Sequence, residues 1–137
     1  MAGSGGSIAF NVSVHRGWLV FTLDNRLSIT LTASFALTRE RSYISRIAEA
    51  NLHSVQRFLR QREPSYSLMT AAEPGSRYTL TGFEVDRQPV GDLDVRVSGA
   101  LAQAPFDVLL GLDFLRRFGS VCFDPHASRI SFEPPTV

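Results

Sequence analysis

The sequence predicts an all-β domain that contains one sizeable helix. Most of the chain alternates apolar and polar residues with the period of half-buried strands, and short segments rich in Gly, Pro, Asp and Asn separate these runs. One stretch differs, because its apolar residues recur at the spacing of a helix face between Ile44 and Pro64. These two patterns together predict a β-rich fold with one helix.

The first part of the chain reads as strands joined by turns. Residues 8–15 alternate strictly and end at Arg16-Gly17, and residues 18–23 form a second apolar run. Residues 24–26 follow as a turn, because Asp and Asn tolerate the left-handed backbone region. Residues 27–34 resume the alternation, so we predict a meander.

The predicted helix is followed by a loop. The helix has its apolar residues on one face: Ile44, Ile47, Ala48, Leu52, Val55, Phe58 and Leu59. Ser42 and Ser45 precede it and suit helix capping. Residues 57–62 form a basic helix end, which could contact RNA or an acidic partner but which the helix dipole already explains. Residues 63–76 contain Pro, Ser and Gly and predict a loop.

Further strands follow this loop. Residues 78–85 and 93–97 read as strands around a turn at residues 86–89. The apolar run 107–110 is typical of a strand that is buried on both faces. Gly111 then supplies the backbone freedom for a sharp turn.

A short helix and a hairpin follow Gly111. Asp113 suits the first helical turn, Arg116 and Arg117 suit the last, and Gly119 reads as the helix terminator. The inward face of this helix consists of Leu112, Phe114, Leu115 and Phe118. Strands at 121–123 and 129–132 form the predicted hairpin, with its turn at 124–128. We expect the core to bury Leu109, Leu110, Leu115 and Phe123.

Composition and charge limit the possible classes of protein. The chain has 137 residues with 44% apolar content, which predicts one domain over residues 8–137 after a flexible linker or cloning scar at residues 1–7. The chain has 14 basic residues, all Arg, and 13 acidic residues, which give a net charge of +1. We therefore expect no overall electrostatic field that would attract nucleic acid or a membrane. Without a signal pattern or an apolar run of about 18 residues, we expect an intracellular, cytoplasmic protein without membrane contact.

Cysteine and histidine give no indication of a metal or cofactor. The single cysteine, Cys122, lies in a predicted strand, where a buried and inert thiol is the expected state. The three histidines, His15, His53 and His126, have no ligand spacing among them, and His53 is expected at the surface. We therefore predict no metal and no cofactor.

Two segments carry a resemblance to a known family. Residues 106–118, Phe-Asp-Val-Leu-Leu-Gly-Leu-Asp-Phe-Leu-Arg-Arg-Phe, with the hairpin that follows to Phe132, resemble the C-terminal half of the retropepsin-like aspartic peptidase domain. Residues 41–52, which begin Arg-Ser-Tyr-Ile-Ser, are similar to the family segment after the catalytic loop. The resemblance covers about residues 18–132 and implies a homodimeric acid-protease half-barrel.

The catalytic triplet of that family, Asp-Thr/Ser-Gly, is absent from the sequence. Counting back from Ser42 places Ala36 at the position of the family Asp, so that residues 35–38 cover the triplet. A second register makes Asp24 the acid, because residues 18–30 also resemble a strand that enters the catalytic loop. That register needs a two-residue deletion and places Arg26 at the family glycine.

The resemblance implies a degenerate peptidase fold. The family mechanism requires two carboxylates that share one proton, one from each chain of a homodimer, and Ala36 would remove both. We therefore predict a pseudo-peptidase domain that dimerises and binds a peptide or protein. The predicted binding cleft consists of Ala36, Leu37, Thr38, Gly82, Phe83, Leu110 and Gly111, with residues 78–97 as a flap-like hairpin. The alternative is a hydrolase that uses Asp24, or altered chemistry in the same cleft.

Overall fold

The computed structural model describes residues 7–27 and 29–135 of the chain, so that all but the last residue of the predicted linker 1–7 lies outside the described residues. In the first half, the elements in chain order are β1 (Ile8–Asn11), β2 (Ser13–His15), β3 (Trp18–Asp24), β4 (Thr30–Phe35), β5 (Ser42–Ser45) and α1 (Arg46–Arg62). The second half contains β6 (Met69–Glu73), β7 (Arg77–Leu80), β8 (Glu84–Val85), β9 (Gln88–Pro89), β10 (Leu93–Ser98), a 3-10 helix η2 (Gly99–Leu101), β11 (Val108–Leu110), α2 (Leu112–Leu115), β12 (Ser120–Asp124) and β13 (Arg129–Glu133). The β-rich fold with one sizeable helix that the sequence predicts is confirmed.

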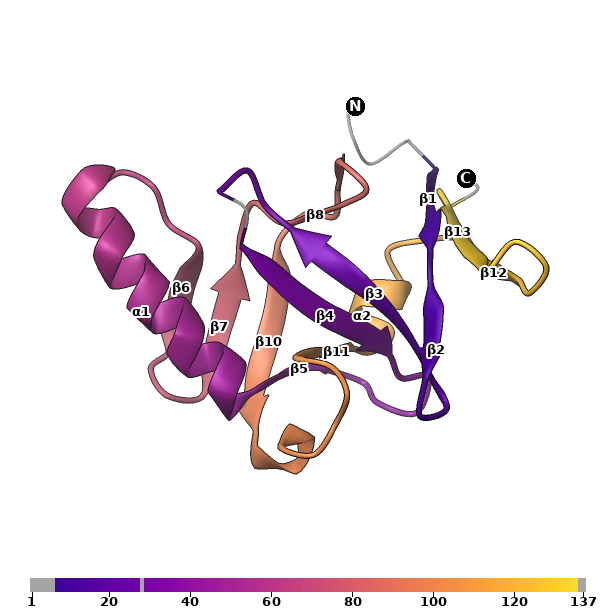
Figure 1. Ribbon diagram of the computed structural model, residues 1–137, viewed down its shortest axis with the longest axis horizontal. Helices are drawn as coiled ribbons and strands as arrows, with labels where there is room; N and C mark the ends of the chain where they lie inside the picture. The colour runs from indigo at the N-terminus through magenta and orange to yellow at the C-terminus, as the bar shows by residue number, and fades with distance from the viewer. Residues whose placement is uncertain (1–6, 28, 136–137) are drawn as a thin grey trace.

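The strands form two sheets. The larger sheet has the strand order β6-β7-β10-β5-β11-β4-β3-β8-β9, with β2 paired to β3, and it curls into a half-barrel (Figure 1). The smaller sheet has the order β1-β13-β12 and lies at the end of the molecule opposite α1 (Figure 1). Within the larger sheet, β11 runs parallel to β4 and antiparallel to β5, so it lies between the two strands that flank residues 36–41.

Several predicted strands differ from the observed ones. The predicted strand 8–15 is divided into β1 and β2, because β1 pairs with β13 whereas β2 pairs with β3. The predicted loop 63–76 contains β6, which forms an antiparallel pair with β7. The predicted strand 78–85 is interrupted at Gly82, where φ is +79°.

Helix α1 begins after Ser45, so Ile44, which the sequence placed on the helix face, lies in β5 instead, and the helix buries only part of the predicted face. The hydroxyl of Ser45 accepts a hydrogen bond from the Ala48 amide at 3.1 Å and caps the helix, as predicted. The buried residues of α1 are Ala48, Leu52, Gln56 and Leu59, while Ile47 and Phe58 are exposed, contrary to the prediction. The reason is Gln56, whose side chain accepts from the Leu68 amide at 2.6 Å and so faces the core despite its polarity.

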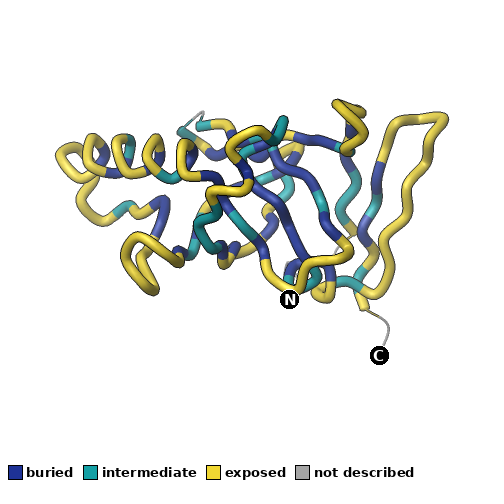
Figure 2. Tube along the Cα trace, turned by 90° about the horizontal axis from the view of Figure 1, so that it is seen from below, coloured by how far each residue is buried: buried dark blue, intermediate teal, exposed yellow. Residues whose placement is uncertain are grey.

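The main core lies between the larger sheet, α1 and the smaller sheet (Figure 2). Aromatic rings connect its parts: Phe10 lies 4.8 Å from Phe21 and 5.5 Å from Phe132, measured between ring centroids. Leu109, Leu110 and Leu115 are buried as predicted.

The prediction that Phe123 and Cys122 are buried is wrong. Phe123 is 43% exposed and Cys122 is exposed, because the core covers neither face of β12 and all five residues of this strand are exposed. In addition, no helix among residues 7–27 and 29–135 is long and apolar enough to cross a membrane.

Candidate functional site

Residues 36–41 connect β4 to β5 and are called here the 36–41 loop. This loop packs across the turn between β11 and α2. The Ala36 amide donates to the Leu110 carbonyl at 2.9 Å, which continues the pairing of β4 with β11. On the far side of the turn, the Leu112 amide donates to the Arg39 carbonyl at 2.8 Å. The Asp113 amide likewise donates to the Glu40 carbonyl at 3.1 Å. The loop is therefore held at both of its ends by backbone hydrogen bonds.

Gly111 allows the loop and the turn to approach each other closely. A Cβ atom placed on Gly111 would lie 2.3 Å from the carbonyl oxygen of Arg41 and 2.8 Å from that of Arg39. Both distances are far below van der Waals contact, and the atoms concerned belong to the backbone. Only glycine fits at this crossing.

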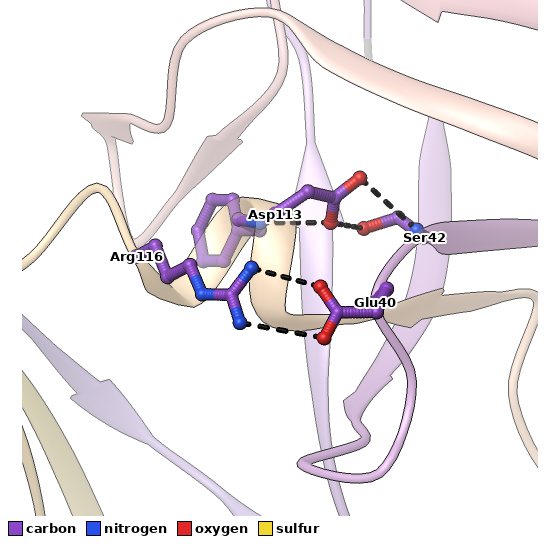
Figure 3. Close-up of polar contacts among 5 residues, drawn as sticks. Glu40, Ser42, Asp113 and Arg116 are labelled. Atoms are coloured by element: carbon purple, nitrogen blue, oxygen red, sulfur yellow. Dashed lines mark hydrogen bonds and ion pairs between the residues drawn. The ribbon is translucent and has the colours of Figure 1, made fainter.

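The side chains of Ser42 and Asp113 join the loop to α2 (Figure 3). The Ser42 hydroxyl donates to Asp113 Oδ1 at 2.7 Å, and the Ser42 amide donates to Oδ2 at 3.2 Å. The Gly111 amide donates to the Ser42 hydroxyl at 3.0 Å. Ser42 thus joins two segments and does not cap α1, contrary to the prediction.

An ion pair adds to this connection at the surface (Figure 3). Arg116 Nη1 and Nη2 donate to the two Glu40 carboxylate oxygens at 2.8 and 3.4 Å. Because both side chains are more than half exposed, solvent screens the pair, and we expect it to orient the loop more than to stabilise the fold.

The tip of the loop is apolar. Ala36 is 7% exposed and packs with Val20, Phe106 and Leu109 in a small second core. Leu37 is 74% exposed, which makes it the most exposed large apolar side chain among the described residues. Neither residue, nor Thr38 after it, has a side chain that can carry a charge, so the start of the loop offers no acid or base.

Of the other predicted cleft residues, Leu110 and Gly111 lie beside the 36–41 loop, whereas Gly82 and Phe83 lie elsewhere in the fold. Phe83 and Leu110 are each 1% exposed within the main core, and a Cβ on Gly82 would lie 3.1 Å from the Tyr66 hydroxyl. The hairpin predicted as a flap is attached to the body, because Glu84 of β8 pairs with Asp24 of β3. Phe83 and Leu110 therefore support the fold and do not line an open surface.

Asp24, the alternative acid, is exposed at the end of β3. Its carboxylate accepts from the Thr30 hydroxyl at 3.1 Å. The guanidinium of Arg26 lies 4.6 Å from the centroid of the Tyr66 ring. The turn between them is fixed by buried Asn25, whose Oδ1 accepts from two backbone amides, the nearer at 2.9 Å.

Sequence reasoning missed a polar cluster between α1 and β7. The Tyr78 hydroxyl donates to Glu49 Oε2 at 2.6 Å and accepts from the Gly75 amide at 2.8 Å. His53 Nε2 lies 3.0 Å from the same hydroxyl. Burial raises the pKa of Tyr78 above its ordinary value, and the hydrogen bond to Glu49 raises it further. Glu49 and His53 share one face of α1 at i,i+4 spacing, but no sequence signal connects them to Tyr78 on β7.

In the part of the chain that the structure describes, the titratable side chains do not form a metal site. Across residues 7–27 and 29–135, no three side chains of His, Cys, Asp or Glu gather closely enough to hold a metal ion.

A comparison with solved structures agrees with this architecture, whereas two other comparisons found no match. No family model matches the sequence, and no relative was found among curated proteins. Among solved structures, the chain is similar to a retropepsin-like aspartic protease from Rickettsia conorii, with a TM-score of 0.50 and 12% sequence identity. The match covers 93% of this chain and 90% of that protein. The chain therefore has a retropepsin-like fold.

Proposed function

We propose that the chain is a non-catalytic retropepsin-like domain that forms a homodimer and binds a peptide or protein. One observation carries the proposal. The 36–41 loop is held against β11 and α2 by backbone hydrogen bonds and by Ser42 and Asp113, yet its first three residues are Ala36, Leu37 and Thr38. A precisely held loop without an ionisable group at its start suits binding better than acid-base chemistry.

The chemistry of aspartic peptidases supports a non-catalytic role for this domain. Two facing carboxylates share one proton, so that one acts as acid and the other as base on a water molecule. In a symmetric dimer each chain supplies one carboxylate, and an alanine in that position removes both. General acid-base catalysis contributes a factor of about 10²–10⁴ in rate, all of which such a dimer lacks.

Exposed apolar side chains favour the formation of a dimer. Three large apolar side chains are exposed: Leu37 on the loop at 74%, and Val121 and Phe123 on β12 at 40% and 43%. As the edge strand of the smaller sheet, β12 also leaves backbone hydrogen-bonding groups on its outer side without a strand partner among the described residues. A second copy related by a two-fold axis would cover such surfaces.

Sedimentation at micromolar concentration tests the dimer. We expect about twice the 15.1 kDa mass of the chain. The substitution Leu37→Ser is expected to weaken the dimer, whereas Ile47→Ser, which removes a similarly exposed apolar side chain from α1, is expected to leave it intact. A wild-type monomer, or equal effects of the two substitutions, would contradict the proposed interface.

A peptide mixture tests the binding role. The wild-type protein is expected to retain peptides without producing new termini between about pH 3 and 8, where aspartic-type chemistry would operate. Retention is expected to weaken when Leu37→Ser removes the apolar tip. New termini that disappear in Asp24→Asn would favour the alternative, a hydrolase that uses Asp24.

A further inference from the structure

A hollow on the larger sheet lies beside the 36–41 loop. It has a volume of about 260 Å³ and is lined by residues of β5, β6, β7, β10 and α2 together with the loop. Three arginines line it, Arg41, Arg77 and Arg96, and they come from three separate segments of the chain. The hollow also adjoins Ser42 and Asp113, which hold the loop in place.

Two of the arginines face each other across a strand pair. Arg96 of β10 and Arg77 of β7 are partners in the antiparallel register, so their side chains leave the sheet on the same face. Like charges directly opposite each other destabilise a sheet. An anion bound between them would remove this repulsion.

Of these three arginines, Arg77 alone has a carboxylate within 4.0 Å among the described residues. Arg77 Nε lies 3.4 Å from Glu73, in a pair in which both side chains are largely exposed. Among the residues that the structure describes, neither Arg41 nor Arg96 lies within 4.0 Å of a carboxylate oxygen.

Two carboxylates do line the hollow, but they bind neutral donors. Asp94 accepts from the Thr79 hydroxyl at 2.8 Å. Asp113 accepts from the hydroxyl and amide of Ser42 and from the Phe114 amide. The guanidinium groups therefore keep donors for a ligand, although the two aspartates reduce the local positive charge.

We propose that this hollow binds a phosphate group. Guanidinium groups match oxyanions through paired, charge-assisted hydrogen bonds. Three arginines on separate segments can donate hydrogen bonds from several directions, which suits the oxygens of a tetrahedral anion. A planar carboxylate needs only the two parallel donors of a single guanidinium group. The volume lies just below the roughly 300–1,000 Å³ of pockets for whole small molecules, which suits a phosphate group more than a large ligand. The inference does not depend on the proposed dimer or peptide role.

Calorimetric titration with inorganic phosphate tests the inference, in a phosphate-free buffer at constant ionic strength. We expect saturable binding to the wild-type protein. Arg96→Gln and Arg41→Gln are each expected to weaken it about tenfold or more, because each removes hydrogen bonds to a charged group. Arg57→Gln, which removes an exposed arginine from α1, is the matched control and is expected to bind as the wild type does.

The free protein provides a second measurement. Without phosphate, Arg96→Gln is expected to unfold at or above the wild-type midpoint, because the repulsion opposite Arg77 is removed. An anchoring role for Arg96 within the fold would instead lower the midpoint.

Two further ligands identify the source of the phosphate. Phosphoserine that binds more tightly than inorganic phosphate would indicate a phosphate ester as the ligand, and equal affinity would indicate the free ion. Acetate that binds as tightly as phosphate, an absence of saturable binding, or an equal loss in Arg57→Gln would overturn the inference.

Discussion

Replacement of Gly111 by alanine tests the crossing of the 36–41 loop. The added Cβ would lie 2.3 Å from the Arg41 carbonyl oxygen and 2.8 Å from the Arg39 carbonyl oxygen. Overpacking of this kind costs about 1–3 kcal/mol, and the clash with backbone puts this site at the upper end. Alanine restricts the unfolded chain and returns about 0.4–1 kcal/mol. We therefore expect a net loss of about 2 kcal/mol in the free energy of unfolding.

Denaturant and thermal unfolding, followed by circular dichroism, measure this loss. For a chain of this length, 2 kcal/mol corresponds to a fall of about 8 °C in the thermal midpoint. Gly99→Ala is the matched control, because the three atoms nearest its Cβ all belong to the flexible Arg46 side chain, the closest at 3.4 Å. We expect the control to stay within about 0.5 kcal/mol of the wild type. A Gly111→Ala protein as stable as the control would refute the crossing.

Three further substitutions test separate parts of the structure. Ser42→Ala removes partners from the Gly111 amide and the Asp113 carboxylate and is expected to lower the free energy of unfolding by about 1–3 kcal/mol in urea titrations; a neutral result would contradict the role of Ser42. The pKa of Tyr78 is raised in the folded state, so the unfolded chain loses this proton at a lower pH than the folded chain does. The contribution of Tyr78 to the free energy of unfolding is therefore fully present below about pH 10 and is lost as the pH rises through the folded pKa. Tyr78→Phe is expected to make that fall shallower, and an unchanged pH profile of unfolding would argue against it. Asp24→Asn is expected to change stability by less than about 0.5 kcal/mol, which thermal unfolding can measure; a larger change would indicate a structural or catalytic role.

Local sequence patterns predict most of the strands, but they do not predict which strand faces are buried by the rest of the fold. The apolar run over residues 18–23 predicts β3, which buries Val20 and Phe21 on opposite faces, and the alternation over residues 129–132 predicts β13, which has one face on the core. The sequence pattern also predicts a buried Phe123, although all five residues of β12 are exposed in the described part of the chain. Strand β6 was missed because all its residues except Met69 are exposed, so only its pairing with β7 defines it.

The candidate site depends on contacts between distant segments. Ser42 and Asp113 are 71 positions apart, and each residue alone suits a helix cap, which is why the sequence predicted capping. Gly111 was recognised as a turn, but the approach of the Arg41 carbonyl could not be inferred from spacing. Gln56 sets the rotation of α1 through contacts with residues 66–69, which no periodicity of apolar residues can show.

The most direct test of the proposed function restores the family triplet in the 36–41 loop. The triple substitution Ala36→Asp, Leu37→Thr and Thr38→Gly would place an Asp-Thr-Gly sequence where β4 ends. New termini are then measured in a peptide mixture between about pH 3 and 8. The proposal predicts no cleavage by the wild type and acid-dependent cleavage by the triple variant. Cleavage by the wild type that Asp24→Asn abolishes would contradict it.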